Sequence, residues 1–190
     1  MIAWALLPLS LLFALLSAVR RGLYRAGLLR VERLPVPVIV VGNIAVGGSG
    51  KTPVALWLAA ELKARGYTPG IVSRGYGGST EGVAEVKAGG DPACFGDEPV
   101  LMAAVSRCPV FVGRDRPAAA RALLASYGRV DVIIADDGLQ HYRLGRDVEI
   151  VVVDETILGN RLRLPAGPLR EGVGRIAAST LVMAHGALSA

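Results

Sequence analysis

A glycine-rich run between an apolar stretch and a helical pattern is the feature that most constrains the fold of this chain. The run is Gly47-Gly48-Ser49-Gly50-Lys51-Thr52, and it directly follows Val38-Ile39-Val40-Val41. A helix is predicted behind it to about residue 66, because Val54, Leu58 and Leu62 share one helical face. This order of strand, glycine-rich loop, Lys-Thr and helix is typical of phosphate-binding P-loops and predicts a nucleoside triphosphate site.

The loop has the chemistry of an anion site. Backbone N–H groups of such a loop, with the start of the following helix, surround phosphate oxygens, and glycines let the backbone approach closely. We assign nucleotide binding to residues 47–52, with Lys51 on the β- and γ-phosphates and the Thr52 hydroxyl on Mg²⁺. The usual pattern has its first glycine where this chain has Ala45. A glycine-rich turn with an accidental Lys-Thr pair is therefore the alternative.

Strands and helices alternate along the rest of the chain. The expected strands cover residues 38–41, 69–73, 109–113, 130–135, 148–154 and 180–184. Further helices are predicted over 97–106 and 114–127, whereas the polar, glycine-containing residues 79–96 are predicted to form an exposed loop or a small hairpin. This alternation predicts an α/β fold, in this case a P-loop NTPase-like, mostly parallel sheet flanked by helices.

The first 33 residues differ in character from the rest. Residues 2–19 carry no charge, and a run of this length is near the lower limit for a bilayer span. Residues 1–34 then hold five arginines against the single acid Glu32, so they contribute +4 of the net charge of +5. These arginines are Arg20, Arg21, Arg25, Arg30 and Arg33. Such a local excess argues against a nucleic-acid surface spread over the domain.

Three roles are open for this N-terminal segment. A signal peptide would need its basic region before the apolar run, and here the arginines follow it. A transmembrane helix would place them in the cytoplasm, and an interfacial helix would lie flat with them on anionic headgroups. We therefore divide the chain into a membrane-associated helix, 1–33, and a nucleotide-binding domain, 34–190. Cys94 and Cys108 lack metal-ligand spacing, which favours a reducing, cytosolic compartment.

Acidic residues follow one of the predicted strands. The apolar run 132–135 ends in Asp136-Asp137, and P-loop proteins hold Mg²⁺ with a carboxylate at the end of such a strand. A solvated Asp-Asp-Gly turn is the alternative. We therefore predict that Asp136 and Asp137 belong to a metal site.

A second acidic pair, Asp97-Glu98, opens a predicted helix. Acids at a helix start commonly serve only as caps and complement the helix dipole. The alternative is a general base that takes a hydroxyl proton while the oxygen attacks the γ-phosphate. His141 follows the first acidic pair by a few residues and is compatible with a base, a phosphate ligand or a turn residue.

Taken together, these motifs resemble the tetraacyldisaccharide 4′-kinase family, the lipid A 4′-kinases of Gram-negative bacteria. The matching segments run in the family's order along nearly the whole chain, and the displaced first glycine and the apolar, arginine-flanked N-terminus belong to the same pattern. The segments are Leu34-Pro35-Val36-Pro37-Val38, Val41-Gly42-Asn43-Ile44 with the glycine-rich loop, Ser73-Arg74-Gly75-Tyr76, Gly96-Asp97-Glu98-Pro99, Asp136-Asp137-Gly138-Leu139-Gln140-His141 and Leu164-Pro165-Ala166-Gly167-Pro168-Leu169-Arg170-Glu171.

The resemblance implies a reaction and a set of roles. ATP would phosphorylate the 4′-hydroxyl of an acylated glucosamine disaccharide 1-phosphate, giving lipid IVA at the cytoplasmic face of the inner membrane. It implies Mg²⁺, with Asp136, Asp137 and Glu171 around the metal. It also implies that Asp97 is the base with Glu98 beside it, and that His141 lies close to the site. Arg74 and Arg170 lie in matching motifs and are assigned to phosphate contacts.

The chain departs from the family in length. Family members are longer and carry a second, smaller domain, from which a histidine is thought to assist the catalytic aspartate. No residue of this sequence matches that histidine, so we expect the chain to be an N-terminal fragment. A membrane-tethered P-loop NTPase and a fragment that binds nucleotide without catalysis are the alternatives. No nucleic-acid partner and no obligate protein partner is indicated.

Overall fold

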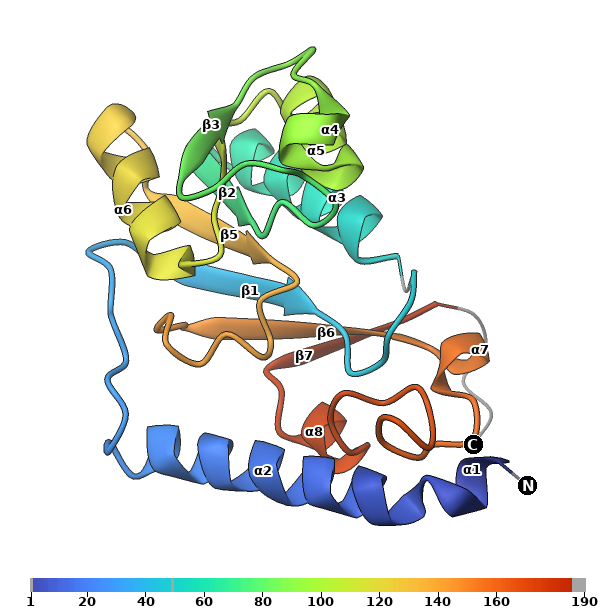
Figure 1. Ribbon diagram of the computed structural model, residues 1–190. Coiled ribbons are helices and arrows are strands. Elements are labelled where there is room, and N and C mark those ends of the chain that lie inside the picture. Colours follow the sequence, from blue (N-terminus) through green and yellow to red (C-terminus); the bar gives the residue numbers. More distant parts are fainter. Residues whose placement is uncertain (1, 49, 186–190) are drawn as a thin grey trace.

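The chain forms a seven-stranded sheet with helices on both faces (Figure 1). The computed structural model describes residues 2–48 and 50–185. The strand order is β3-β4-β2-β5-β1-β6-β7, and all neighbours are parallel except β3 and β4. The strands are β1 (Val38–Gly42), β2 (Pro69–Ser73), β3 (Ala84–Val86), β4 (Val110–Val112), β5 (Val132–Asp136), β6 (Val148–Asp154) and β7 (Leu181–His185).

The central strands are covered on both faces, which is why they read as continuous apolar runs. Every residue of β2, β4 and β5 is buried, as expected for a parallel sheet between helices. Side chains that alternate along β1 enter different clusters: Val40 packs with Ala119 and Leu123 of α6, whereas Val41 packs with Ala55 of α3. The predicted α/β fold with a mostly parallel sheet is confirmed.

The helices begin and end where local signals place them. Asp115 caps α6, because its carboxylate accepts a hydrogen bond from the backbone N–H of Ala118 at 3.3 Å. Asp91 caps α4 in the same way through Ala93. The helices of the domain are α3 (Lys51–Ala64), α4 (Pro92–Phe95), α5 (Asp97–Ser106), α6 (Arg116–Ser126), α7 (Glu155–Leu158) and α8 (Gly174–Ala177).

The segment 79–96 is more ordered than a loop or a self-contained hairpin. Its strand β3 pairs with β4, which lies later in the chain, and forms the antiparallel edge of the sheet. The short helix α4 follows it. A three-residue strand leaves too little periodicity to predict a pairing with a distant partner, so the sequence-based expectation of a hairpin is corrected here.

The N-terminal segment forms α1 (Ile2–Ala5) and the long α2 (Leu7–Arg25), and α2 lies along the domain beside α8 (Figure 1). The Ser10 hydroxyl donates to the carbonyl oxygen of Arg163 at 2.8 Å, and the Arg163 guanidinium donates to the carbonyl oxygen of Ala14 at 3.2 Å. These hydrogen bonds fix one face of α2 against the domain. The opposite face exposes apolar side chains, among them Leu9, Leu12, Leu15, Leu16, Val19 and Leu23. Among the described residues, α2 alone has the length and composition of a membrane span.

Candidate active site

Strand order brings the two sequence-predicted phosphate and metal elements to one edge of the sheet. β1 and β5 are parallel neighbours, and Val41 lies opposite Asp136 in their register. The glycine-rich loop follows β1, and Asp136-Asp137 ends β5, so both leave the sheet at its carboxyl edge. Open α/β sheets bind ligands at this edge.

The glycine-rich loop leaves the start of α3 free for a ligand. Gly47 and Gly50 have φ of 123° and 75°, a region that favours glycine. Gly50 is the N-cap of α3, and no side chain within residues 2–48 and 50–185 caps the helix there. The first-turn N–H groups and the helix dipole are thus available to an anion. Ser49, also assigned to nucleotide binding, lies outside the described residues.

A cleft of about 440 Å³ lies beside this loop. Its lining includes the glycine-rich loop, the predicted general base with its neighbouring acid, and one predicted metal ligand. The lining residues are Val46, Gly47, Gly48, Lys51, Arg74, Tyr76, Asp97, Glu98, Asp137 and Arg170. Thr52 is the second residue of α3 and is half-buried. The cleft therefore joins five separate segments of the chain into one site that contains both cationic and acidic side chains.

Asp137 lies between two cations of the cleft. Its Oδ1 is 3.8 Å from Nζ of Lys51, and its Oδ2 accepts a hydrogen bond of 3.0 Å from Nη1 of Arg170. The backbone of Asp137 has a φ of 47°, which aspartate tolerates better than most residues. Because Lys51 is almost fully buried, this pair holds the lysine in the cleft.

Asp136 lies beneath the cleft and is almost fully buried. Its Oδ2 accepts a hydrogen bond from the Ser73 hydroxyl at 3.2 Å, whereas its Oδ1 has no hydrogen-bond partner among the described residues. The pKa of Asp136 is raised from 3.8 to about 6, mainly by burial and also by the nearby carboxylates of Glu98 and Asp137, against the opposing effects of Lys51 and Ser73. The negative charge of Asp136 is therefore buried without enough hydrogen bonds or cations to stabilise it.

Close backbone contacts aim Asp97 and Glu98 into the cleft. α5 begins at Asp97, directly after Gly96, whose φ is 87°. A Cβ on Gly96 would collide with the carbonyl oxygen of Tyr76, and one on Gly78 would collide with that of Cys94. The loop after β2 and the loop before α5 thus pack backbone against backbone. Both acids also lie in the first turn of α5, where they complement the helix dipole.

The structure does not bring Glu171 to the other proposed metal ligands. Its Oε1 accepts a hydrogen bond of 3.0 Å from Gln140, and its Oε2 lies 3.2 Å from Nε of Arg175 and 3.6 Å from Nη1 of Arg21. Glu171 is buried and does not line the cleft. Two guanidinium groups already neutralise this carboxylate, which is the physical reason for its different position. Among the described residues, no group of three or more His, Cys, Asp or Glu side chains has a metal-binding arrangement.

His141 lines a recess of about 260 Å³ that shares Arg74, Asp137 and Arg170 with the cleft and adds Arg20 of α2. The pKa of His141 is lowered to about 4, mainly by burial and also by the positive charges of Arg116, Arg74 and other arginines. The imidazole is thus neutral at pH 7. A neutral ring next to the cleft is compatible with proton acceptance or with a hydrogen bond to a ligand.

Sequence reasoning missed Ser73 and Arg116 as members of the site. Arg116 is fully buried and donates to the carbonyl oxygens of Gly113, at 2.8 Å, and Asp136, at 3.4 Å. Burial lowers its pKa to about 10, against the opposing effects of Asp136 and Asp137. Ser73 stands in a motif that was recognised, at the end of β2 beside β5. Arg116 carries no such signal, since it opens an alanine-rich helix.

Comparisons with known proteins place this arrangement in context. A family model described as "Tetraacyldisaccharide-1-P 4'-kinase" matches residues 2–190. The tetraacyldisaccharide 4'-kinases of Aromatoleum aromaticum and of Azoarcus sp. (strain BH72) are 67% and 65% identical to the chain over 184 residues. These alignments cover 97% of this chain and 55% and 54% of the two relatives. The chain therefore spans about half the length of the curated relatives it matches.

A solved structure shares the fold. The crystal structure of the "apo" form of LpxK from Aquifex aeolicus in complex with ATP matches with a TM-score of 0.88 and 36% sequence identity. The match covers 97% of this chain and 59% of that chain. The arrangement of strands and helices described above is thus also that of a protein solved with ATP.

Proposed function

The chain belongs to the tetraacyldisaccharide-1-P 4'-kinase family, and from this premise we propose that it transfers the γ-phosphate of ATP to the 4′-hydroxyl of a tetraacylated glucosamine disaccharide 1-phosphate. The products would be the bisphosphorylated lipid, lipid IVA, and ADP, which leaves as the bond between the β- and γ-phosphates breaks. The observation that carries the proposal is the cleft in which Lys51 and Asp137 face Asp97 and Glu98. A phosphate-binding lysine, a metal-type carboxylate and a candidate base share one space there.

The P-loop residues supply electrostatic stabilisation. The free N–H groups of the loop and of the first turn of α3, with the Lys51 ammonium, surround the phosphates and oppose the charge that develops on the transferred group. Arg74 and Arg170 line the same cleft and add two guanidinium groups that form bidentate contacts with phosphate. These groups bind the nucleotide and orient its terminal phosphate for in-line attack.

Asp97 is the proposed general base. It stands opposite the loop at the start of α5, and backbone contacts of Gly96 fix its position. Its carboxylate would take the proton of the 4′-hydroxyl as the oxygen attacks. Glu98 and neutral His141 would orient the sugar beside it.

The residues present fit a divalent cation. Asp136 has a buried oxygen without a hydrogen-bond partner among the described residues, and Asp137 and Glu98 raise its pKa through like-charge repulsion. A cation would relieve both penalties. We propose that Asp136, Asp137 and Thr52 hold Mg²⁺, which would offset charge on the phosphates. Glu171 is not included because it is buried against Arg21 and Arg175, away from the lining of the cleft. The remaining steps are carried by Lys51, Asp97 and the loop amides.

We further propose that α2 holds the domain, residues 34–190, on the cytoplasmic face of the inner membrane. Its polar contacts through Ser10 and Ala14 face the protein, while its leucine-rich face is exposed. A helix fixed to the domain on one face and apolar on the other favours the interfacial arrangement over a span. The acyl chains of the substrate would then stay in the bilayer while the sugar reaches the cleft.

The test is an assay with γ-labelled ATP, Mg²⁺ and the disaccharide lipid in mixed micelles. The expected result is label on the 4′ position of the sugar, identified by mass spectrometry, and its loss in Lys51→Ala. Release of inorganic phosphate without lipid labelling would favour the membrane-tethered NTPase instead. Nucleotide binding with neither product would favour a chain that binds ATP without catalysis.

A further inference from the structure

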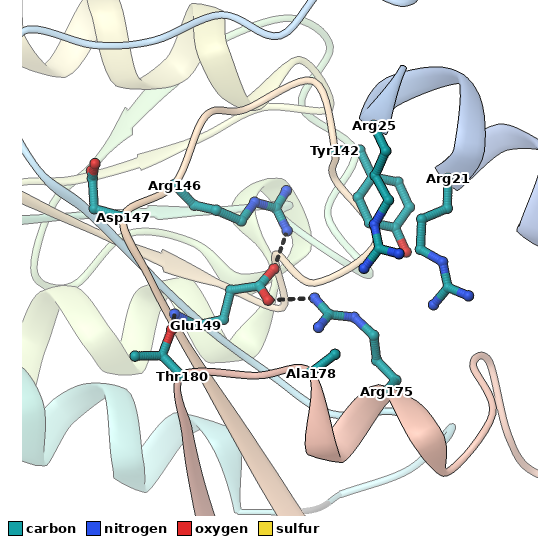
Figure 2. A pocket seen from close by; sticks show the side chains of 9 residues that line it. All are labelled: Arg21, Arg25, Tyr142, Arg146, Asp147, Glu149, Arg175, Ala178 and Thr180. Atoms are coloured by element: carbon teal, nitrogen blue, oxygen red, sulfur yellow. Dashed lines mark hydrogen bonds and ion pairs between the residues drawn. The ribbon is translucent and has the colours of Figure 1, made fainter. Parts of the chain in front are cut away.

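A second pocket, separate from the nucleotide cleft, lies between α2 and the edge of the domain (Figure 2). It has a volume of about 290 Å³ and shares no lining residue with the cleft. Its walls are the last turns of α2, the loop before β6, the start of β6 and the segment around α8. Four of its lining residues are arginines: Arg21, Arg25, Arg146 and Arg175.

The arginines are partly preorganised by one carboxylate. Glu149 accepts a hydrogen bond of 3.0 Å from Nη1 of Arg146 through one oxygen and one of 2.5 Å from Nη2 of Arg175 through the other. Figure 2 shows both guanidinium groups held against this side chain. The Arg146 guanidinium also donates to the carbonyl oxygens of Leu139, Leu144 and His141, so these bonds fix its charge rigidly at the pocket wall.

The charge of the pocket is positive. Glu149 pairs with Arg146 and Arg175, and Glu171 pairs with Arg21 and Arg175. Asp147 points away from the arginines (Figure 2) and accepts from the backbone N–H of Val38 at 2.8 Å. Four guanidinium groups therefore stand against two carboxylates. Arg25 forms no ion pair with any carboxylate in the described part of the chain, and it is exposed at the end of α2. The pocket thus offers an unneutralised cation at its mouth.

Guanidinium groups on two sides of a small pocket match the geometry of a phosphate group. Arg21 and Arg25 belong to the same helix whose other face exposes Leu15, Leu16 and Val19. A ligand that carries both a phosphate and acyl chains would satisfy the pocket and this apolar face together. We propose that this pocket binds a phosphate group carried by a membrane lipid.

Two lipids present that chemistry at this place. One is the disaccharide substrate, whose 1-phosphate lies at the far end from the 4′-hydroxyl; this source rests on the proposed function. Arg20 lines the recess beside the cleft, and Arg21 and Arg25 line the second pocket, so α2 runs past both. The other source is the headgroup of an anionic phospholipid, which does not depend on the proposed function.

The test compares Arg25→Gln with the matched control Arg30→Gln, which removes the same charge from an exposed residue outside the pocket. Flotation is measured with neutral phosphatidylcholine vesicles, alone or with the disaccharide 1-phosphate lipid, the same lipid without its phosphate, or phosphatidylglycerol. We expect the affinity gained from a lipid phosphate to fall about tenfold in Arg25→Gln and to stay within about twofold of wild type in Arg30→Gln.

The readout is vesicle binding and not kinase turnover. The phosphate-binding proposal is therefore tested even if the chain is inactive as a kinase. If Arg25→Gln loses the added affinity only for vesicles with the disaccharide 1-phosphate, the substrate carries the phosphate that the pocket binds. If it loses the added affinity only for vesicles with phosphatidylglycerol, the phospholipid carries it. Equal losses in both variants, or a gain that Arg25→Gln leaves intact, overturn the proposal. The circular dichroism spectrum and unfolding midpoint of Arg25→Gln are checked against wild type.

Discussion

The Ser73 hydroxyl lies 3.2 Å from Oδ2 of Asp136 and donates the side-chain hydrogen bond that this buried carboxylate receives within the described part of the chain. β2 and β5 are neighbours in the sheet, so the contact follows directly from the topology. One hydrogen bond does not offset burial beside Glu98 and Asp137, and the pKa of Asp136 is accordingly about 6. Several properties of the site follow from this imbalance.

The first prediction concerns stability and pH. Since the pKa of Asp136 is raised from 3.8 to about 6 on folding, the folded protein retains a proton that the unfolded chain releases between these values. Stability from this group is therefore present below about pH 4 and is lost as the pH rises through 6. With a metal chelator present, the free energy of unfolding of Asp136→Asn should rise relative to that of wild type by up to about 3 kcal/mol as the pH goes from 4 to 7. Urea unfolding at each pH measures it.

Mg²⁺ provides the internal control for that measurement. Because the metal binds the ionised carboxylate, adding it at pH 7 should stabilise wild type and have little effect on Asp136→Asn. A stability difference that stays flat from pH 4 to pH 7 would contradict the raised pKa. Equal stabilisation of both proteins by Mg²⁺ would exclude Asp136 as a ligand.

The second prediction tests the P-loop. Lys51→Ala removes the buried ammonium beside Asp137 and should lower the affinity for ATP at least tenfold, about the loss of one charge-assisted contact, and turnover further. Lys87→Ala, at an exposed position away from the cleft, is the matched control and should bind ATP as wild type does. Fluorescence of a labelled nucleotide measures the binding. Unchanged affinity in Lys51→Ala would exclude the loop as the nucleotide site.

The third prediction separates a base from a metal ligand. Asp97→Asn should lower kcat by about 10² to 10⁴ while the affinity for ATP stays near that of wild type, since the base acts only on the sugar hydroxyl. Glu98→Gln should have a smaller effect on kcat. The readout is kcat against Kd for ATP, each over a range of Mg²⁺ concentrations. If ATP affinity fell in proportion to kcat, a metal role would replace the base role.

Much of the fold is legible in the sequence because local signals bound the elements sharply. β2 (Pro69–Ser73) and β6 (Val148–Asp154) have the predicted bounds, since each is an apolar run between polar or turn-forming residues. β3 was not predicted as a sheet strand, because its pairing with β4 depends on tertiary contact rather than on its three residues. The N-terminal helix was predicted, but its position along the domain was not.

The geometry of the site is harder to predict from the sequence than the fold, because motifs identify residue types and not the directions of their side chains. Lys51, Asp97 and Asp137 meet in the cleft since the loops that carry them all leave the same edge of the sheet. Glu171 belongs to a recognised motif, yet its carboxylate turns to Arg21, which lies on a helix 150 positions earlier. Arg116 stayed unrecognised since a buried arginine in an alanine-rich helix has no sequence signature.

The fourth prediction concerns the exposed face of α2. Replacing Leu12 and Leu16 by Gln removes two exposed leucines one turn apart, and partition into vesicles should weaken about 100-fold, the sum of two leucine transfers. Leu101→Gln removes a leucine of similar exposure on α5 and should leave partition unchanged. Flotation with vesicles gives both values. Unchanged partition of the double variant would mean that another surface of the protein binds the membrane.

The last prediction tests how the proposed base is positioned. Gly96 has a φ of 87°, and a Cβ there would collide with the carbonyl oxygen of Tyr76. Gly96→Ala should lower the free energy of unfolding by about 2 to 4 kcal/mol. It should also move Asp97 and lower kcat.

Gly128→Ala is the matched control for that substitution, because Gly128 has no positive φ and a Cβ there meets no atom within 4 Å. Gly128→Ala should leave both the free energy of unfolding and kcat near the wild-type values. Urea unfolding and kcat at a temperature where all three proteins are folded separate a loss of stability from displacement of Asp97. Since the added Cβ would meet a backbone oxygen of Tyr76, no side-chain rotation relieves the contact. Wild-type kcat in folded Gly96→Ala would therefore show that Asp97 need not stand where this contact puts it.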